Sequence, residues 1–222
     1  MTTTPFSGWS DAALDFHRRL ELQNDRTFWL ANKPVYDTEV RAPFDALGEQ
    51  VAEEFGPLRV FRPNRDVRFS KDKAPYKTRC YAATEGAGGA SYYVEISAQG
   101  LAVATGYWMM APDQLARYRQ AVDDDSAGPE LERIVADVGR RGLDVEGPAL
   151  KTAPRGYARD HPRVELLRRK SLAAMTRFPP ADWLGTAAAA DRIIGVWRAG
   201  ADMNAWLDHH VGPSTAPPPD AP

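Results

Sequence analysis

The chain has 222 residues, of which 43% are hydrophobic, and its formal net charge is −2. This length and apolar content are enough for one large domain with a continuous core. The apolar runs are shorter than the roughly 18 residues that cross a bilayer, so we expect no membrane span. The near-zero charge argues against a bulk polyelectrolyte binder such as a non-specific chromatin protein.

The N-terminus and the cysteine content predict a cytoplasmic protein. Residues 1–7 lack the charged and apolar regions of a signal peptide. The single cysteine, Cys80, cannot form an internal disulfide, which agrees with a reducing compartment. Because no linker rich in Ser, Gly or Pro interrupts the middle, we expect one domain over residues 1–211. A disordered Pro/Ala-rich tail is expected over residues 212–222.

The first quarter of the chain has the pattern of two helices. Ser10 is a good N-cap and predicts a helix over Ser10–Leu22, after which Asn24-Asp25 indicates a turn. Pro34 suits a first helical position and predicts that the second helix starts there. Apolar side chains then recur at helical spacing until Gly56-Pro57 ends the helix.

After Gly56-Pro57 the apolar period changes from that of a helix to that of a strand. The expected strands are Leu58–Phe61, Asp66–Phe69, Arg79–Thr84, Tyr92–Ser97 and Leu101–Tyr107. The glycine-containing joints at residues 86–89 and 98–100 have the length and chemistry of hairpin turns. The sequence therefore predicts a run of antiparallel strands in the middle of the chain.

Helical patterns return in the C-terminal half. The expected helices are Pro112–Val122, Pro129–Arg141, a short basic one over Pro162–Lys170, and a final one capped by Thr186. Met175–Phe178 is predicted to be an edge strand. Helices at both ends around a central run of strands predict an α+β fold with an antiparallel or mixed sheet.

Two basic segments stand out in a chain that is acidic elsewhere. Residues 59–79 contain eight Lys and Arg against two Asp, a net charge of +6. Residues 151–177 contain eight Lys and Arg against one Asp and one Glu, again +6. A nearly neutral protein can therefore still offer a local site for an anion.

The first basic segment carries the main site hypothesis. Alternation in the expected strand places Asp66 and Arg68 on one face, away from the core. The residues expected in the core are Val67 and Phe69. A partly buried Asp–Arg pair needs further partners, which predicts either a ligand or a structural ion-pair network.

Specific roles follow for the charged residues of this segment. The predicted anion ligands are Arg62, Arg65, Arg68, Lys73, Tyr76 and Lys77. Asp66 and Asp72 are candidates to orient a cation or to act as a base. The alternative for the stretch around Asp72 is a solvated charged loop.

The second basic segment is predicted to complete the same site. Arg155 is a predicted ligand, and His161, which follows Asp160, is a candidate general acid or base. The alternative for His161 is a cap on the following helix. The sequence has no zinc-ligand spacing, no P-loop and no Ser/His/Asp order, so we predict no metal site and name no cofactor.

The charged stretch also carries a resemblance to a known family. Residues 62–78 read RPNRDVRFSKDKAPYKT and resemble the signature of DUF2461, a conserved-hypothetical family found in bacteria and some fungi. Further stretches that agree are Asn24–Trp29, Tyr92–Val94, Leu115–Arg119, Leu150–Pro162 and Leu166–Lys170. The resemblance covers about residues 6–206. It implies a bacterial single-domain protein in which these motifs matter, and it implies no reaction because the family has no settled activity.

Two functions of different classes follow, together with one structural alternative. The first is binding of an anionic small molecule that bears phosphate or carboxylate, by either a binding protein or an enzyme. The second is a non-catalytic module that binds nucleic acid or an acidic protein through a basic face. In the third, the ion pairs only hold the fold together. The sequence leaves the substrate and the oligomeric state open.

Overall fold

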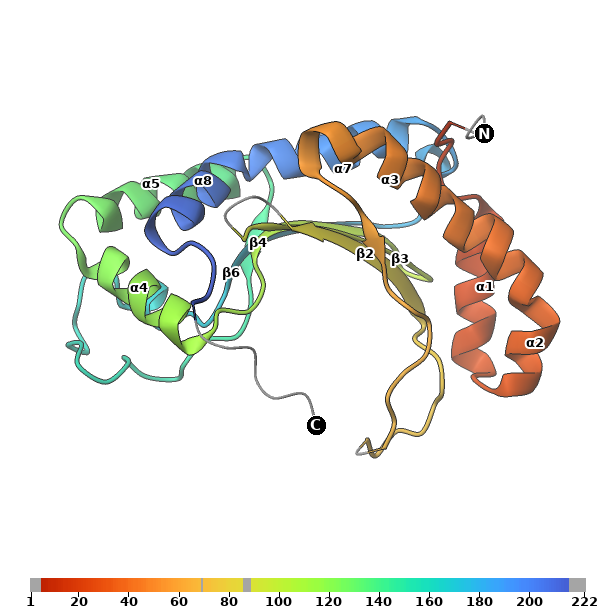
Figure 1. Ribbon diagram of the computed structural model, residues 1–222, viewed down its shortest axis with the longest axis horizontal. Coiled ribbons are helices and arrows are strands. Elements are labelled where there is room, and N and C mark those ends of the chain that lie inside the picture. Colours follow the sequence, from red (N-terminus) through yellow and green to blue (C-terminus); the bar gives the residue numbers. More distant parts are fainter. Residues whose placement is uncertain (1–4, 69, 86–88, 216–222) are drawn as a thin grey trace. The chain divides into compact units, whose positions relative to one another are not determined.

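The computed structural model describes residues 5–68, 70–85 and 89–215, and within them the chain folds into helices and one antiparallel sheet (Figure 1). The strands are β1 (Arg59–Val60), β2 (Arg79–Glu85), β3 (Ser91–Ser97), β4 (Gly100–Tyr107), β5 (Asp144–Glu146) and β6 (Leu172–Phe178). Their order across the sheet is β1-β2-β3-β4-β6-β5. The predicted α+β class is confirmed.

The helices group before, between and after the strands. The α-helices are α1 (Asp11–Leu22), α2 (Arg26–Val35), α3 (Ala42–Phe55), α4 (Pro112–Asp123), α5 (Ala127–Arg140), α6 (Val164–Leu167), α7 (Ala188–Ala199) and α8 (Ala201–His210). A π-helical segment, η1 (Tyr36–Arg41), joins α2 to α3, and a 3-10 turn, η2 (Asp182–Gly185), follows β6. None of these helices is long and apolar enough to span a membrane.

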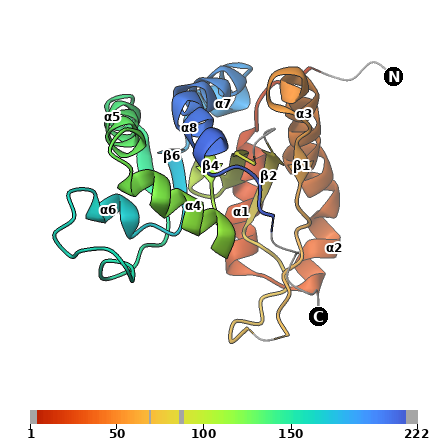
Figure 2. The ribbon, with the colours of Figure 1, turned by 60° about the vertical axis from the view of Figure 1, so that its left-hand side comes forward.

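Contacts within the chain divide it into two compact units. The first unit is Met1–Thr84, Tyr92–Val103 and Arg177–Gly195, and the second is Glu85–Ser91, Ala104–Thr176 and Val196–Pro222. In the first unit α1, α2, η1 and α3 pack in succession, and in the second α4, α5 and α8 pack together (Figure 2). The single-domain extent over residues 1–211 stays a prediction. Most of the predicted tail, from residue 216 onward, lies outside the described residues.

The start of the second helix differs from the prediction. Asp25, expected in a turn, is instead the N-cap of α2, because its carboxylate accepts from the Phe28 amide at 2.8 Å. Pro34 lies inside α2 and not at its beginning. Proline removes one donor from the helical ladder, and the π-helical segment η1 begins two residues after Pro34. The helical run therefore reaches from Arg26 to Phe55 in three joined segments.

Three strand and helix predictions need correction. Residues 66–68 of the expected strand Asp66–Phe69 are not in a strand, and Phe69 lies outside the described residues. Met175–Phe178 is part of the longer β6, which lies inside the sheet because the three-residue β5 covers its outer side. The final helix is broken at Gly200, where a Cβ would come within 2.3 Å of the Thr105 side chain.

Candidate functional site

The chain between β1 and β2 forms a projecting two-armed loop whose arms are hydrogen-bonded to each other (Figure 1). We call residues 61–68 and 70–78 the charged loop. The Arg65 amide donates to the Pro75 carbonyl at 2.9 Å, and the Lys77 amide donates to the Pro63 carbonyl at 2.8 Å. Between these bonds Asn64 and Tyr76 form an isolated antiparallel bridge. The base of the loop is therefore ordered even though it contains no regular strand.

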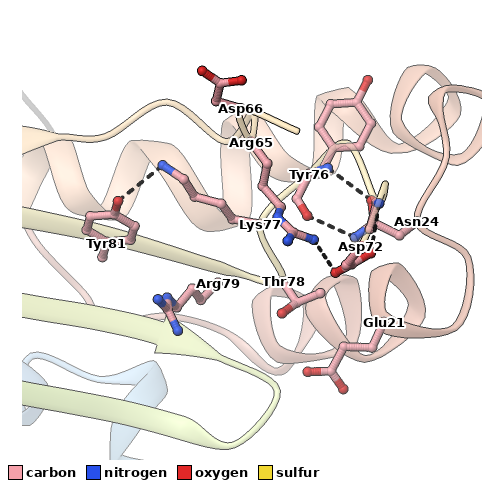
Figure 3. A pocket seen from close by; sticks show the side chains of 11 residues that line it. Glu21, Asn24, Arg65, Asp66, Asp72, Tyr76, Lys77, Thr78, Arg79 and Tyr81 are labelled. Carbon is pink, nitrogen blue, oxygen red and sulfur yellow. Dashed lines mark hydrogen bonds and ion pairs between the residues drawn. The ribbon is translucent and has the colours of Figure 1, made fainter. Parts of the chain in front are cut away.

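Asn24 and Trp29 anchor the loop to the N-terminal helices. The Asn24 amide brackets the backbone of Tyr76, accepting from its N–H at 3.1 Å and donating to its carbonyl at 2.9 Å (Figure 3). The Tyr76 ring is buried and stacks on Trp29, with centroids 4.3 Å apart and planes 12° from parallel. Tyr76 thus fastens the loop, and its predicted role as a donor to an anion stays a prediction.

Ion pairs fix the outer part of the loop. Nη1 of Arg65 lies 2.5 Å from the Asp72 carboxylate, which also accepts from the Ala74 amide at 2.9 Å. Asp66 and Arg68, predicted to project together, form an exposed ion pair of 2.7 Å. Their partnership is as expected, although it arises in a bend and not from strand alternation.

Two of the three lysines of the loop, Lys73 and Lys77, bind backbone carbonyls. Nζ of Lys73 donates to the Val67 carbonyl at 2.9 Å. Nζ of Lys77 donates to the Arg62 carbonyl at 2.8 Å and to the Tyr81 hydroxyl at 3.2 Å. Much of the positive charge therefore stabilises the loop itself, which gives the structural interpretation partial support.

Both carboxylates of the loop are held in the charged form. Hydrogen bonds from the Arg68 side chain and then from its backbone N–H lower the pKa of Asp66 to about 2. The Ala74 amide, and after it the Arg65 side chain, lower the pKa of Asp72. A general base works best with a pKa near the operating pH. These carboxylates are therefore better suited to orienting cations than to accepting a proton.

A depression of about 680 Å³ lies between the charged loop, the α1–α2 junction and the first residues of β2. Its lining consists of Glu21, Asn24, Arg65, Asp66, Asp72, Ala74, Tyr76, Lys77, Thr78, Arg79 and Tyr81 (Figure 3). Five of the residues predicted from the sequence are in this set. Arg62, Arg68 and Lys73 belong to the same loop but not to the lining.

Strand alternation brings Arg79 and Tyr81 to the floor of the depression, a contribution that the sequence-based prediction missed. Cys80 and Ala82 point to the core and are 3% and 0% exposed, so Arg79 and Tyr81, which alternate with them along β2, face the other way. Arg79 pairs there with Glu95 of β3 at 3.1 Å. The Tyr93 hydroxyl also donates to Glu95, and burial followed by this carboxylate raises the pKa of Tyr93. Alternation along the predicted strand Arg79–Thr84 was the signal that could have identified both residues.

The two candidates from the second basic segment lie in the other unit. Nε2 of His161 is 3.0 Å from the Asp123 carboxylate, and its Nδ1 accepts from the Arg163 amide at 3.0 Å. Both ring nitrogens therefore hold the loop before α6. Arg155 is exposed in the same loop. The predicted joining of Arg155 and His161 with the charged loop stays a prediction.

Metal coordination finds no support in the residues described. Within residues 5–68, 70–85 and 89–215, no group of three or more His, Cys, Asp or Glu side chains is placed to hold a metal ion. Two of the acidic side chains of the depression instead pair with arginines, Asp72 with Arg65 and Asp66 with Arg68. The lining thus has the chemistry of hydrogen bonds and ion pairs.

Comparison with known proteins connects the sequence to a family. The family model described as "Conserved hypothetical protein (DUF2461)" matches residues 12–206. Comparisons with curated proteins and with solved structures give no match. The matched region includes the whole charged loop and the Asn24–Trp29 stretch that anchors it. Because the match covers most of the 222 residues, the chain belongs to the DUF2461 family of conserved hypothetical proteins.

Proposed function

We propose that this chain binds an anionic group, phosphate or carboxylate, in the depression beside the charged loop. Arg65, Lys77 and Arg79 supply positive charge to its lining. The observation that carries the proposal is that Asp72 fixes Arg65 at the wall of the depression, with 29% of its side chain exposed. A guanidinium that is already held in place loses less freedom when it pairs with an oxyanion.

The two arginines keep donors for a ligand. A guanidinium has five N–H donors. Among the described residues, the ion pair with Asp72 engages Nη1 of Arg65, and that with Glu95 engages Nε of Arg79. The other N–H groups offer the forked geometry that phosphate and carboxylate oxygens accept. Asp72 orients Arg65 in this arrangement, and Asp66 orients Arg68 beside it.

Calorimetric titration of the full chain with inorganic phosphate and pyrophosphate tests the proposal. Wild-type protein binds, and Arg65→Gln raises Kd by at least about tenfold, the equivalent of about 1.4 kcal/mol. Arg140→Gln is the matched control, because Arg140 is also an arginine paired with an aspartate, Asp137, but lies on α5 in the other unit. Equal binding by wild type and Arg65→Gln, or no binding by either, overturns the proposal.

The same protein samples also test the two alternatives that the sequence leaves open, a purely structural role and nucleic-acid binding. Under the structural alternative, Arg65→Gln unfolds the protein, which thermal denaturation followed by circular dichroism detects. Under the nucleic-acid alternative, oligonucleotide binding falls steeply between low and physiological salt. Under the proposal, pyrophosphate binding changes much less over that range, because the ligand contacts few cations.

The sequence also predicts that Arg155 and His161 of the second basic segment belong to the same site. Backbone NMR shifts of Arg155 and His161 during the pyrophosphate titration test it. Saturable shifts with the same Kd as those of Arg65 place both residues in the bound site. Unchanged shifts restrict the site to the first unit.

A further inference from the structure

A row of aromatic rings extends from the depression along the sheet face opposite the core. Phe61 stacks on Tyr81 with centroids 4.8 Å apart and planes 25° from parallel, and Tyr81 lies 5.7 Å from Tyr93 of β3. All three side chains are half-buried. The exposed face of an antiparallel sheet usually carries polar side chains. Aromatic rings in this position can offer a flat surface to a planar ligand.

Cations already occupy the place above the Tyr81 ring. Nζ of Lys77 is 4.7 Å from its centroid, and the Arg79 guanidinium carbon is 5.9 Å from it. Both side chains also line the depression. For a planar group to stack on this ring, Lys77 has to exchange its bond with the Tyr81 hydroxyl for a bond with the phosphate, while Arg79 stays paired with Glu95 and turns its other N–H groups to the ligand.

The lining of the depression carries charges of both signs. Three of its side chains are cationic, and three are carboxylates, namely Glu21, Asp66 and Asp72. A long polyanion would be repelled by these carboxylates, so a phosphate track along the depression is a poor fit. Carboxylates do suit a ligand that also has hydroxyl or amino donors. The volume of about 680 Å³ lies within the range of small-molecule sites.

We propose that the ligand is a mononucleotide, an inference that rests on the proposed function and names its ligand class. Arg65 and Arg79 bind the phosphate, and the base stacks against Tyr81. Glu21, at the exposed end of α1, accepts from a ribose hydroxyl or an amino group of the base. A nucleotide combines an anionic part for the arginines, a planar part for Tyr81 and hydrogen-bond donors for Glu21.

Titration of the full chain with three matched ligands tests the inference. Adenosine 5′-monophosphate binds at least about tenfold more tightly than ribose 5-phosphate, because base stacking on an aromatic ring adds affinity. Adenosine alone binds more weakly than its monophosphate. Tyr81→Leu removes the preference for the nucleotide over ribose 5-phosphate, whereas Tyr81→Phe, which keeps the ring, preserves this preference.

The control for these variants is Tyr92→Leu, since Tyr92 lies on the next strand but packs against Phe55 of α3. This variant retains the nucleotide preference. Equal affinities for the monophosphate and for ribose 5-phosphate overturn the nucleotide inference while leaving anion binding intact. Binding of short oligonucleotides without binding of the mononucleotide also overturns it. Failure of all phosphorylated ligands to bind contradicts the proposed function itself.

Discussion

The two basic segments carry the same net charge but use their cations differently. In residues 59–79, Arg65 and Arg79 pair with carboxylates at the lining of a depression. In residues 151–177, Arg163 donates to the carbonyls of Val122 at 2.6 Å and Asp123 at 2.9 Å, at the C-terminal end of α4. Cations near a helix C-terminus satisfy its orphan carbonyls and complement its dipole.

A second arginine of this segment also binds a backbone carbonyl. Nε of Arg168 donates to the Leu150 carbonyl at 2.6 Å, and the Glu165 carboxylate pairs with the same guanidinium at 2.7 Å. The Arg163 side chain is only 8% exposed. The net charge of a segment therefore indicates where cations gather. It does not distinguish a binding surface from arginines that bind backbone carbonyls inside the fold. What distinguishes them is whether the donors end on carbonyls inside the fold or at an open surface.

The largest expected effect is on the buried cap. Arg163→Met should lower the free energy of unfolding by about 3 kcal/mol, because it leaves the carbonyls at the end of α4 without their charged donor. Urea denaturation measures the change. Arg159→Met, at an exposed arginine of the same segment, is the control and should change stability little. Equal losses in the two variants would remove the distinction between caps and surface cations.

Much of the fold could be predicted from the spacing of apolar residues. The strands β2, β3 and β4 and the helices α1, α4 and α5 appear close to their predicted positions, because each buries a regular stripe of side chains. The strand Asp66–Phe69 was wrong because alternating charges there reflect local ion pairs. β5 was missed because three residues are too few to show a period.

The sequence predicted the site residues of the charged loop but not the residues around the loop. The density of charge identified Arg65, Asp72 and Lys77, all of which line the depression. The role of Asn24 depends on a bond to Tyr76, 52 positions later, and no local pattern reveals such a distance in sequence. Arg79 was missed for a different reason: the net charge of a segment does not show which face of β2 the side chain occupies, and that face is what brings Arg79 to the depression.

The next largest effect concerns the anchor of the charged loop. Asn24→Ala should lower the free energy of unfolding by about 2 kcal/mol, because it removes two hydrogen bonds to the Tyr76 backbone. It should also weaken pyrophosphate binding, since Arg65 depends on an ordered loop. Asn32→Ala, which removes one bond within α2, is the control. Loss of stability without any loss of binding would show that the anchor does not position the cations.

Substitution of one arginine in each basic segment should affect stability little but should affect anion binding differently. Arg65→Gln and Arg155→Gln should both leave the melting temperature nearly unchanged, because Arg155 is exposed and the Arg65 ion pair lies at the surface, where such pairs contribute little to stability. Arg65→Gln should weaken pyrophosphate binding more than Arg155→Gln, since Arg65 lines the depression. Titration calorimetry on both variants makes the comparison. A greater loss in Arg155→Gln would move the centre of the site to the second segment.

The smallest expected effect is a near absence of pH dependence in anion binding. The pKa of Asp66 is lowered from 3.8 to about 2, so its ion pair stabilises the loop above about pH 4 and weakens as the pH falls toward about 2. The pKa of Asp72 is also lowered, so its ion pair with Arg65 weakens only below the usual range of a carboxyl. Sulfate keeps both negative charges between about pH 7 and about pH 4.5 and is therefore the suitable probe. Its Kd should change less than about twofold between about pH 7 and about pH 4.5. Tighter binding on acidification would mean instead that Asp72 competes with the anion for Arg65, and that its protonation releases the guanidinium.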